Sequence, residues 1–445
     1  MKIAFVTQPW DEVSPGIGGH SSIPILTYQF AHRLPESSEV IIYAKREHSQ
    51  KQAERDDAGI HYRRMSIDAE YWLLKPFKLL DRLPKFRNPH RALFTSSFYY
   101  LGYALQVAHD LRKHRPDIVH IHNFSQFVPV IRAFNPQCKI ALHMHCEWLT
   151  QIDKAVVGPR LCKTDSVIGC SEYITEKVRR RFPQFASRCQ TVFNGVDTDL
   201  FTGRSEPSVS QENNTKRLLF VGRVSPEKGV HVLLDAFQQV VKRLPDAELD
   251  VIGPVGSAPF EFVIPLSDDS KVSNLASFYG RNIRLQGTHY LSHLRAKLGS
   301  DAAKRVFFYG SVPHARLVDF YRKADVLVFP SVWNEPFGMP LIEAMASEVP
   351  TVATRGGGVT EIVDEGKTGL LVERGNAAVL AEAICYLLEN NSLRKSMGKA
   401  GRKRVLELFS WNELARNLSN IYHRLCESNH GQAYRSVSHA RSADH

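Results

Sequence analysis

Residues 218–241 read LLFVGRVSPEKGVHVLLDAFQQVV. The apolar run Leu218–Gly222 predicts a buried strand, Arg223–Gly229 a turn, and Val230–Val241 a helix. A strand that passes through a glycine-containing turn into a helix is the repeating unit of doubly wound α/β domains, whose parallel strands are buried on both faces. This stretch therefore predicts a domain of that class.

The same alternation continues toward the C-terminus. Further apolar runs predict strands at Leu249–Ile252, Val306–Tyr309, Val326–Pro330, Thr351–Thr354 and Gly369–Val372. Residues 217–409 should therefore form one Rossmann-like domain. The stretch 253–301, rich in Ser, Pro and Gly, is expected to be an irregular loop region within it.

A second domain of the same class is predicted before it, over residues 1–203. Its first strand is Ile3–Thr7, and the glycines Gly16, Gly18 and Gly19 precede a helix that ends near Leu34. Later strands are expected at Val40–Ala44, Ile118–His122, Ile140–His145, Ser166–Cys170 and Thr191–Phe193.

Three further segments complete the predicted organisation. The polar residues 204–216 should link the domains, because GRSEPSVSQENNTK (203–216) has no apolar period. A helix over 410–426 should pack back on the N-terminal domain, and the polar residues 428–445 should form a disordered tail. Ligands of open α/β sheets bind at the carboxyl ends of the strands, so two such domains facing a cleft indicate an enzyme with one ligand per domain.

Composition narrows the classes of protein. The 445 residues are 43% hydrophobic and 23% charged, which is typical of a globular protein. The odd number of cysteines, seven, and the lack of a Cys-x-x-Cys pair indicate neither a disulfide framework nor a zinc site. No run suits a membrane span or a signal peptide, so a cytoplasmic protein is expected. The net charge of +11 favours an anionic partner, and its densest cluster, Lys177–Arg181, suits either docking or the end of a helix.

Two cations stand on the turn that follows the first strand of the second domain. Arg223 and Lys228 lie five residues apart after Gly222, beside the positive end of the coming helix. A forked guanidinium, an ammonium group and open backbone amides are what a diphosphate requires. The competing interpretation is a surface turn with two solvated cations.

A second chemical pattern lies in PSVWNEPFGMPLIEAMA, residues 330–346. Glu335 is expected on a loop, Gly338 where a helix opens, and Glu343 about one turn into that helix. Carboxylates accept hydrogen bonds from the paired hydroxyls of a ribose or from a sugar, and the amides of Phe337 and Gly338 suit a hexose oxygen or a developing charge. Alternatively, Glu335 caps the helix and Glu343 faces water.

Together these stretches resemble the family 4 retaining glycosyltransferases of the GT-B fold. VGRVSPEKG (221–229) and EPFGMPLIEAMA (335–346) carry the resemblance, and YGSVPHARLVDFYRKADVLVFPS (309–331) and TVATRGGGVTEIVDEGKTGLLV (351–372) extend it. In the N-terminal half it is looser, resting on the glycine loop 16–19, DIVHIHN (117–123) and FNGVDTDLF (193–201). The resemblance implies transfer of a sugar from a nucleotide donor, most simply a UDP- or GDP-sugar, without a metal or cofactor.

The resemblance also assigns roles to single residues. Arg223 and Lys228 would bind the donor diphosphate and stabilise the leaving nucleotide. Glu343 would hold the ribose and Glu335 the transferred sugar, while Gly19 would let the backbone approach the phosphates. His145 would be the active-site histidine near the reacting sugar. His143 stands where the family more often has a small or hydroxyl residue and receives no such role, whereas His120 and His122 are expected to have a structural or acceptor-side role.

Several alternatives stay open at this point. No Asp-x-Asp pair stands at a strand end, since Asp56-Asp57 and Asp268-Asp269 fall in polar or irregular stretches. An epimerase, a phosphorylase and a non-catalytic homologue are weaker interpretations, and no pattern supports nucleic-acid binding.

The acceptor is expected to be a cell-envelope or lipid-linked glycan, with aromatic and basic residues between Tyr71 and Tyr103 touching the inner face of an anionic membrane. A soluble small-molecule acceptor is the alternative.

Overall fold

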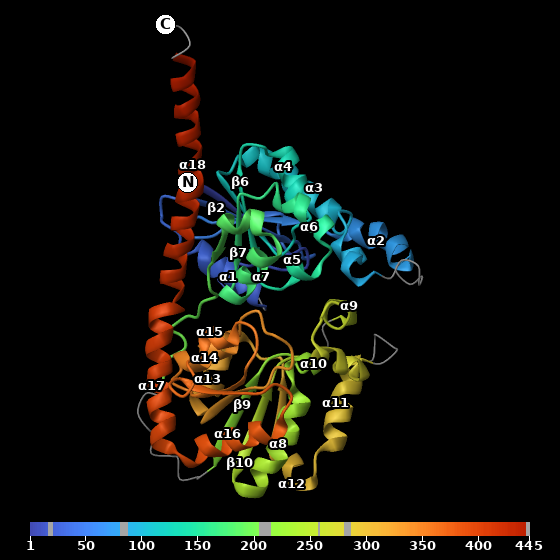
Figure 1. Ribbon diagram of the computed structural model, residues 1–445, viewed down its shortest axis with the longest axis vertical. Coiled ribbons are helices and arrows are strands. Elements are labelled where there is room, and N and C mark those ends of the chain that lie inside the picture. The colour runs from blue at the N-terminus through green and yellow to red at the C-terminus, as the bar shows by residue number, and fades with distance from the viewer. Residues whose placement is uncertain (17–20, 81–87, 204–214, 257–258, 280–285, 442–445) are drawn as a thin grey trace. The chain divides into compact units, whose positions relative to one another are not determined.

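The computed structural model describes residues 1–16, 21–80, 88–203, 215–256, 259–279 and 286–441. The chain forms two compact units, Met1–Asn194 with Trp411–His445 and Gly195–Ser410. Each unit is a sheet with helices packed on it (Figure 1). This confirms the predicted class of two parallel-sheet α/β domains.

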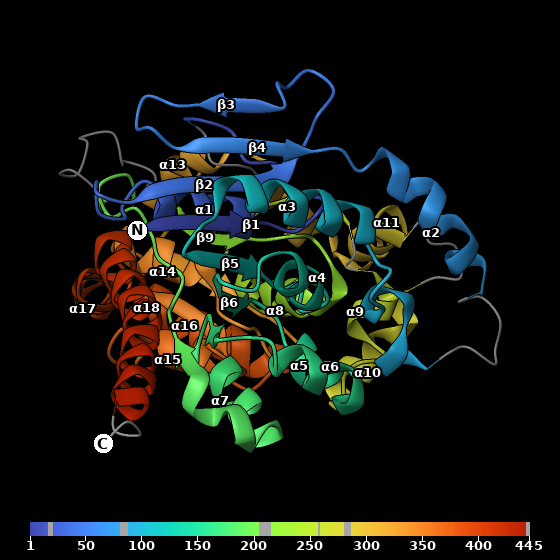
Figure 2. The same cartoon turned by 90° about the horizontal axis from the view of Figure 1, so that it is seen from above.

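The first unit holds a sheet of order β3-β4-β2-β1-β5-β6-β7-β8, most of which Figure 2 shows edge to edge. All neighbouring strands are parallel except β3, which runs antiparallel to β4. Its strands are β1 (Lys2–Val6), β2 (Glu39–Lys45), β3 (Ala53–Arg55), β4 (His61–Met65), β5 (Ile118–His122), β6 (Lys139–Met144), β7 (Ser166–Gly169) and β8 (Cys189–Thr191). The sequence analysis missed β3 and β4, because AER and HYRRM are too polar to stand out as apolar runs.

Helices cover this sheet. They are α1 (Ser22–Ala31), α2 (Asp68–Leu80), α3 (Leu101–His114), α4 (Phe127–Phe134), α5 (Trp148–Gln151), α6 (Lys154–Leu161), α7 (Glu172–Arg181) and α18 (Trp411–Arg441). The last of these arrives from the far end of the chain, and Trp411 packs edge-on against Phe30 of α1 with ring centroids 5.5 Å apart.

The second unit holds a fully parallel sheet of order β11-β10-β9-β12-β13-β14. Its strands are β9 (Lys216–Val221), β10 (Ala247–Ile252), β11 (Val306–Gly310), β12 (Val326–Phe329), β13 (Thr351–Thr354) and β14 (Gly369–Val372). Its longer helices are α8 (Val230–Arg243), α11 (Gln286–Lys297), α13 (Leu317–Lys323), α14 (Met339–Ala346), α16 (Ala377–Glu389) and α17 (Asn391–Leu408). From β9 the chain adds β10 and β11 on one side of the sheet, and it then crosses to the other side to add β12. The order of strands therefore reverses between β9 and β12, which are direct neighbours.

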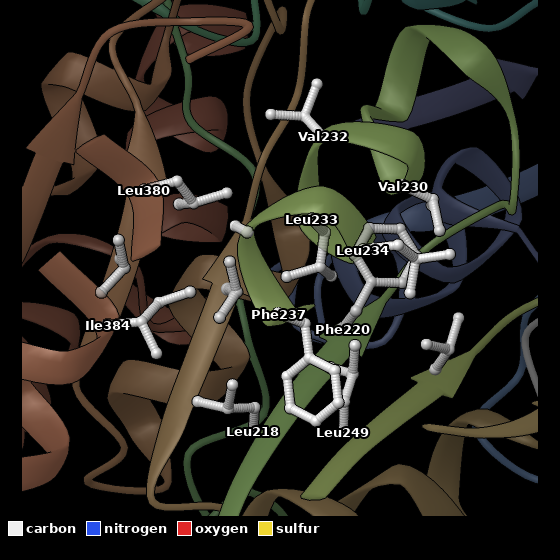
Figure 3. Packing of buried hydrophobic residues seen from close by; sticks show 14 of the residues in the cluster. Leu218, Phe220, Val230, Val232, Leu233, Leu234, Phe237, Leu249, Leu380 and Ile384 are labelled. Atoms are coloured by element: carbon white, nitrogen blue, oxygen red, sulfur yellow. The ribbon is translucent and has the colours of Figure 1, made fainter. Parts of the chain in front are cut away.

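The core of the second unit lies between β9 and the helices α8 and α16. Figure 3 shows Leu218 and Phe220 of β9, Leu233 and Phe237 of α8, and Ile384 of α16 in one cluster. Leu233 and Phe237 are four residues apart, so they lie on one face of α8. This packing fixes α8, and with it the turn that joins β9 to α8.

The boundary between the units differs from the predicted one. The N-terminal segment of the first unit ends at Asn194 rather than at residue 203, so most of FNGVDTDLF belongs to the second unit. Two hydrogen bonds hold it there: the backbone Val196 N donates to Phe409 O at 2.9 Å, and the side chain of Arg402 donates from Nη1 to Phe201 O at 3.0 Å. These partners lie about two hundred residues away, which explains why local composition did not indicate them. Of the predicted linker 204–216, residues 204–214 lie outside the described residues, and Lys216 already begins β9.

The stretch 253–301, expected to be irregular, contains helices. In addition to α11 it forms α9 (Phe260–Val263), α10 (Ser270–Ser273) and α12 (Ser300–Ala303). Three of the four are too short to produce a helical period in the sequence. Asp269 caps α10, where its side chain accepts from Lys271 N at 2.9 Å.

The C-terminal helix is longer than expected. We predicted a helix over 410–426 and a disordered tail from 428, whereas α18 continues to Arg441. The segment lacks proline, and a helix already formed extends without a new nucleation cost. Within the ranges given above, no helix combines the length and apolar character needed to cross a bilayer.

Candidate functional site

The turn after β9 is fixed by close backbone packing. Gly222 has φ 154° and donates its N–H to Ile252 O at 2.9 Å. The turn ends at Gly229, whose φ of 73° is left-handed and whose absent Cβ would lie 1.9 Å from Pro330 O. The turn therefore rests directly on the carboxyl end of β12 and places its side chains beside the loop that follows β12.

Gly229→Ala should destabilise the protein strongly, because the new methyl group combines an unfavourable φ with a backbone clash. We expect a loss of more than about 2 kcal/mol in the free energy of unfolding, measured by chemical denaturation. Gly366→Ala is the matched control, since Gly366 has φ 74° but nothing within 4 Å of its added Cβ. Equal losses in the two variants would contradict the close approach.

Arg223 is held by a buried carboxylate that the sequence analysis did not single out. Its Nη2 lies 3.2 Å from Oε1 of Glu227, which is fully buried, while the arginine side chain is 38% exposed. Glu227 also accepts from Ser225 Oγ at 2.7 Å and from Tyr279 OH at 3.2 Å. Burial and the neighbouring Glu227 raise the pKa of Tyr279, which keeps its phenol protonated as a donor. Glu227 thus orients the guanidinium that the motif placed on the turn.

Lys228 and Glu335 are in direct contact. Lys228 Nζ lies 2.7 and 2.9 Å from the two carboxylate oxygens of Glu335, and 5.3 Å from the centroid of the Trp333 ring. Ser331 Oγ is 2.6 Å from Glu335 Oε1, and Glu335 is only 4% exposed. The interpretation of Lys228 as a solvated surface cation is therefore wrong.

The loop carrying Glu335 is pinned on its other side. Gly358 N donates to Glu335 O at 2.8 Å, and a Cβ at Gly357 would lie 2.1 Å from that oxygen. Phe337 is buried and packs edge-on against Phe409, with centroids 5.9 Å apart. Gly338, with φ 143°, is the N-cap of α14 and provides no side-chain cap. Glu335 therefore does not cap α14, which excludes the alternative weighed above.

Glu343, in α14, is buried rather than facing water. It is 3% exposed, and its oxygens lie 2.7 Å from His314 Nε2 and 2.7 Å from Tyr321 OH. Burial lowers the pKa of His314, but the charge of Glu343 and its hydrogen bond outweigh this, and the net pKa is raised. Phe201 packs on both partners, with its centroid 5.2 Å from the His314 ring and 5.7 Å from the Tyr321 ring.

His314, Tyr321 and Phe201 were missed as site residues. All three stand in stretches that carried the resemblance, which was the available signal, but their convergence on one carboxylate depends on tertiary packing. The second unit thus brings together Arg223, Lys228 and Glu335 around the β9 turn and the loop after β12, with Glu343 following on α14. Gly19 lies outside the described residues.

In the first unit, four histidines share one face of the sheet. His122 pairs with His143 across β5 and β6, and His120 and His145 stand two residues from them along the chain. His120 Nε2 lies 3.2 Å from His143 Nδ1, and His122 Nδ1 lies 3.0 Å from His145 Nε2. Desolvation lowers the pKa of the buried His120, His122 and His143 well below the usual range, and that of the half-buried His145 to about 3, partly opposed by Asn194. All four rings are neutral at physiological pH.

Three of these rings lie close enough to be considered for a metal. The ligand atoms of His120, His122 and His143 lie within 4.8 Å of one another. Five of their six ring nitrogens, however, already have hydrogen-bond partners, which are neighbouring histidines, Thr27 and Tyr422. A cation would have to displace these bonds without a carboxylate ligand in the group, so the arrangement suits a hydrogen-bonded chain better than a metal centre.

The acidic pairs considered for a metal have other partners. Asp269 forms an ion pair with Arg374 at 2.7 Å, and Asp56 accepts from Tyr62 OH at 2.9 Å. The basic cluster Lys177–Arg181 is likewise largely paired within its own unit: Lys177 with Glu147, Arg179 with Glu172, and Arg180 with Glu176. These pairs favour a structural role for the cluster over a docking role.

Comparison with known proteins agrees with this architecture. The family described as Glycosyl transferases group 1 matches residues 204–404, and Glycosyltransferase Family 4 matches residues 25–200. Spore coat protein SA of Bacillus subtilis is 28% identical over 72% of this chain and 82% of its own. The D-inositol 3-phosphate glycosyltransferase of Corynebacterium glutamicum is 32% identical, but the match covers 53% of this chain and about half, 51%, of that protein.

Solved structures show the same fold. Sucrose-phosphate synthase from Thermosynechococcus elongatus superposes with a TM-score of 0.69 at 21% identity, over 96% of this chain and all of that one. Anabaena Alr3699/HepE, in a complex with UDP-glucose, gives a TM-score of 0.61 at 17% identity, over 97% of this chain and all of that one.

Proposed function

Because the chain belongs to the family 4 glycosyltransferases of the GT-B fold, we propose that it moves a sugar from a UDP- or GDP-sugar to an acceptor, with retention of anomeric configuration and without a divalent metal. Glycosyl transfer is the activity of the family. The donor, the stereochemistry and the independence from metal are the proposed part.

One observation carries the proposal: two cations and a carboxylate converge at the carboxyl ends of the neighbouring strands β9 and β12. Arg223 is anchored by Glu227, and Lys228 touches Glu335. Carboxyl ends of parallel strands at a reversal of strand order are where α/β sheets bind nucleotides. A fixed guanidinium and an ammonium group suit the diphosphate of a nucleotide sugar.

The same geometry supports a mechanism. The bond between the anomeric carbon and the diphosphate oxygen breaks, and its electron pair leaves with the diphosphate. Arg223 and Lys228 stabilise the charge that develops there, which is the task a metal ion performs in other transferases. The acceptor hydroxyl oxygen forms the new bond to the anomeric carbon and passes its proton to the departing diphosphate oxygen, which has taken the electron pair of the broken bond. Glu335 would accept hydrogen bonds from the transferred sugar, and Glu343 from the ribose, with His145 acting beside the sugar as the resemblance implies.

Transfer should proceed at full rate in excess EDTA and should give an α-linked product from an α-linked donor. The measurement is a panel of UDP- and GDP-sugars assayed for donor consumption, with the product anomer assigned by NMR. UDP-glucose is the first donor to test, because it is bound in one of the similar structures. An absolute requirement for magnesium or manganese, or an inverted product, would refute the proposal.

The acceptor is proposed to be a lipid-linked or cell-envelope glycan at an anionic membrane surface. The supporting observation is a group of exposed apolar side chains in the first unit: Tyr71 at 70%, Trp72 at 75%, Leu73 at 53% and Phe98 at 58%. Lys75 Nζ lies 5.4 Å from the centroid of the Trp72 ring, which adds a cation to the same part of α2. Aromatic rings beside cations suit the headgroup layer of a bilayer.

Trp72→Ser should reduce co-sedimentation with anionic vesicles at low salt, while Tyr386→Ser should not. Tyr386 is a suitable control because it is an aromatic residue of the second unit that is also exposed, at 53%. Raising the ionic strength should release the unaltered protein, since screening weakens the attraction of the cations. If anionic vesicles bind no more protein than neutral ones at low salt, the acceptor is to be sought among soluble small molecules.

A further inference from the structure

We propose that Thr27 and His122 set the tautomer of His145, so that this ring carries its proton on Nε2 and presents Nδ1 as a hydrogen-bond acceptor. The inference rests on the proposed role of His145 in transfer and identifies two positioning residues for it. It follows from counting protons along a chain of contacts in the first unit.

The first step is the hydroxyl group of Thr27 in α1. Its Oγ1 lies 2.8 Å from Ile23 O, one turn earlier, and 3.1 Å from His122 Nε2. A carbonyl oxygen only accepts, and a hydroxyl has one proton. Both contacts are attractive only if Thr27 donates to Ile23 O and accepts from His122. His122 therefore carries its proton on Nε2.

The second step passes from His122 to His145. His122 is fully buried, and desolvation lowers its pKa well below the usual range, so the ring is neutral and has one proton. With that proton on Nε2, its Nδ1 must accept. The atom 3.0 Å from this Nδ1 is His145 Nε2, which must then be the donor. Desolvation lowers the pKa of His145 to about 3, and the hydrogen bond with the Asn194 side chain opposes this only in part, so His145 is neutral as well. With its single proton on Nε2, its Nδ1 keeps the lone pair.

The backbone of His145 is fixed independently of its ring. Its N–H donates to Asn123 Oδ1 at 2.7 Å, and Asn123 Nδ2 donates in turn to Gln8 Oε1 at 2.9 Å. Asn123 has φ 58°, a left-handed conformation that asparagine tolerates and that directs its amide back toward β6. The peptide and the ring of His145 are therefore both anchored.

The consequence is a defined ligand preference. An acceptor nitrogen takes a hydrogen bond from a hydroxyl group, which a sugar supplies, and it cannot donate to a carbonyl or phosphate oxygen. In the proposed reaction, His145 Nδ1 would accept a hydrogen bond from a hydroxyl group of the transferred sugar or of the acceptor, without taking up its proton. A ring of the opposite tautomer would not accept it at that atom.

The test combines a spectroscopic and a kinetic measurement on the full chain. Two-bond ¹H–¹⁵N correlation spectra report which ring nitrogen of a histidine carries the proton. We expect His145 to be protonated at Nε2 in the unaltered protein and to populate both tautomers in Thr27→Val, with kcat lower by about five- to tenfold and donor KM little changed. Thr27→Ser keeps the hydroxyl and should restore both.

Thr164→Val is the matched control. Thr164 is buried in the same unit, and its hydroxyl donates to the carbonyl oxygen four residues earlier, Arg160 O at 3.1 Å, as that of Thr27 does. Unlike Thr27, it forms no hydrogen bond with a histidine among the described residues. It should leave the spectrum and kcat unchanged. Two results would overturn the proposal. One is a spectrum in which His145 of the unaltered protein carries its proton on Nδ1, and the other is a normal kcat in a Thr27→Val protein in which the tautomer of His145 has changed. Absence of transfer from every donor refutes the proposed function instead, because the spectrum is read without substrate.

Discussion

Replacing Arg223 with alanine should lower the turnover number by about 10²–10³. The guanidinium is fixed before the donor arrives, because Glu227 holds it at 3.2 Å and is itself anchored by Ser225 and Tyr279. A charge placed in advance does not have to reorganise when the diphosphate departs, so its benefit is largest in the transition state. The effect should therefore appear more in kcat than in the affinity for the donor.

Two further variants sharpen this test. Arg243→Ala removes an arginine of the same unit that pairs at the surface with Glu382 and Glu389, and it should leave turnover near normal. Glu227→Gln keeps the side-chain shape but loses the charge that anchors Arg223, so it should lower kcat by a smaller factor. Near-normal turnover in Arg223→Ala would show that the diphosphate binds elsewhere.

Glu343→Gln should weaken binding of the free nucleoside diphosphate by about 10- to 100-fold, since hydrogen bonds to a charged acceptor contribute about 1.5–3 kcal/mol. Glutamine keeps the volume of a side chain that is 3% exposed but accepts at one atom only. Glu335→Gln should mainly impair transfer of the sugar and leave nucleotide affinity close to normal. Calorimetric titration of the nucleoside diphosphate separates the two effects.

The control for these variants is Glu248→Gln, which alters a carboxylate of the same unit that pairs with Arg217 at 2.6 Å. Thermal unfolding should accompany each titration, because Glu343→Gln also weakens the contact with His314. A loss of nucleotide affinity of the same size in Glu335→Gln and Glu343→Gln would contradict the division of roles between the two carboxylates.

Most of the fold could be predicted from local sequence. Buried parallel strands give continuous apolar runs, and β5, β13 and β14 have the predicted limits. The features that were wrong depend on contacts between distant residues. The boundary near Asn194 is set by hydrogen bonds that join residues 196 and 201 to the region of α17. The amino-acid composition of residues 195–203 gives no sign of these distant partners.

The candidate site was predictable in residue type but not in pairing. The motifs identified Arg223, Lys228, Glu335 and Glu343, and the structure adds what each of them touches. Glu227 was visible inside SPEKG, yet its burial and its contact with Arg223 required the turn geometry. The partners of Glu343 lie 22 and 29 residues before it, on a separate helix and a separate turn, so spacing alone could not connect them.

The path of the chain has a consequence for its synthesis. The second unit is one continuous segment, Gly195–Ser410, whereas the first also requires α18, whose Tyr422 hydroxyl lies 2.7 Å from His120 Nδ1. A ribosome delivers the N-terminus first, but the earliest-made strands meet their last helix only after some four hundred residues have been added. The unit begun first is thus completed second, and until then the buried face of β5 lacks the phenol that completes its hydrogen bonding.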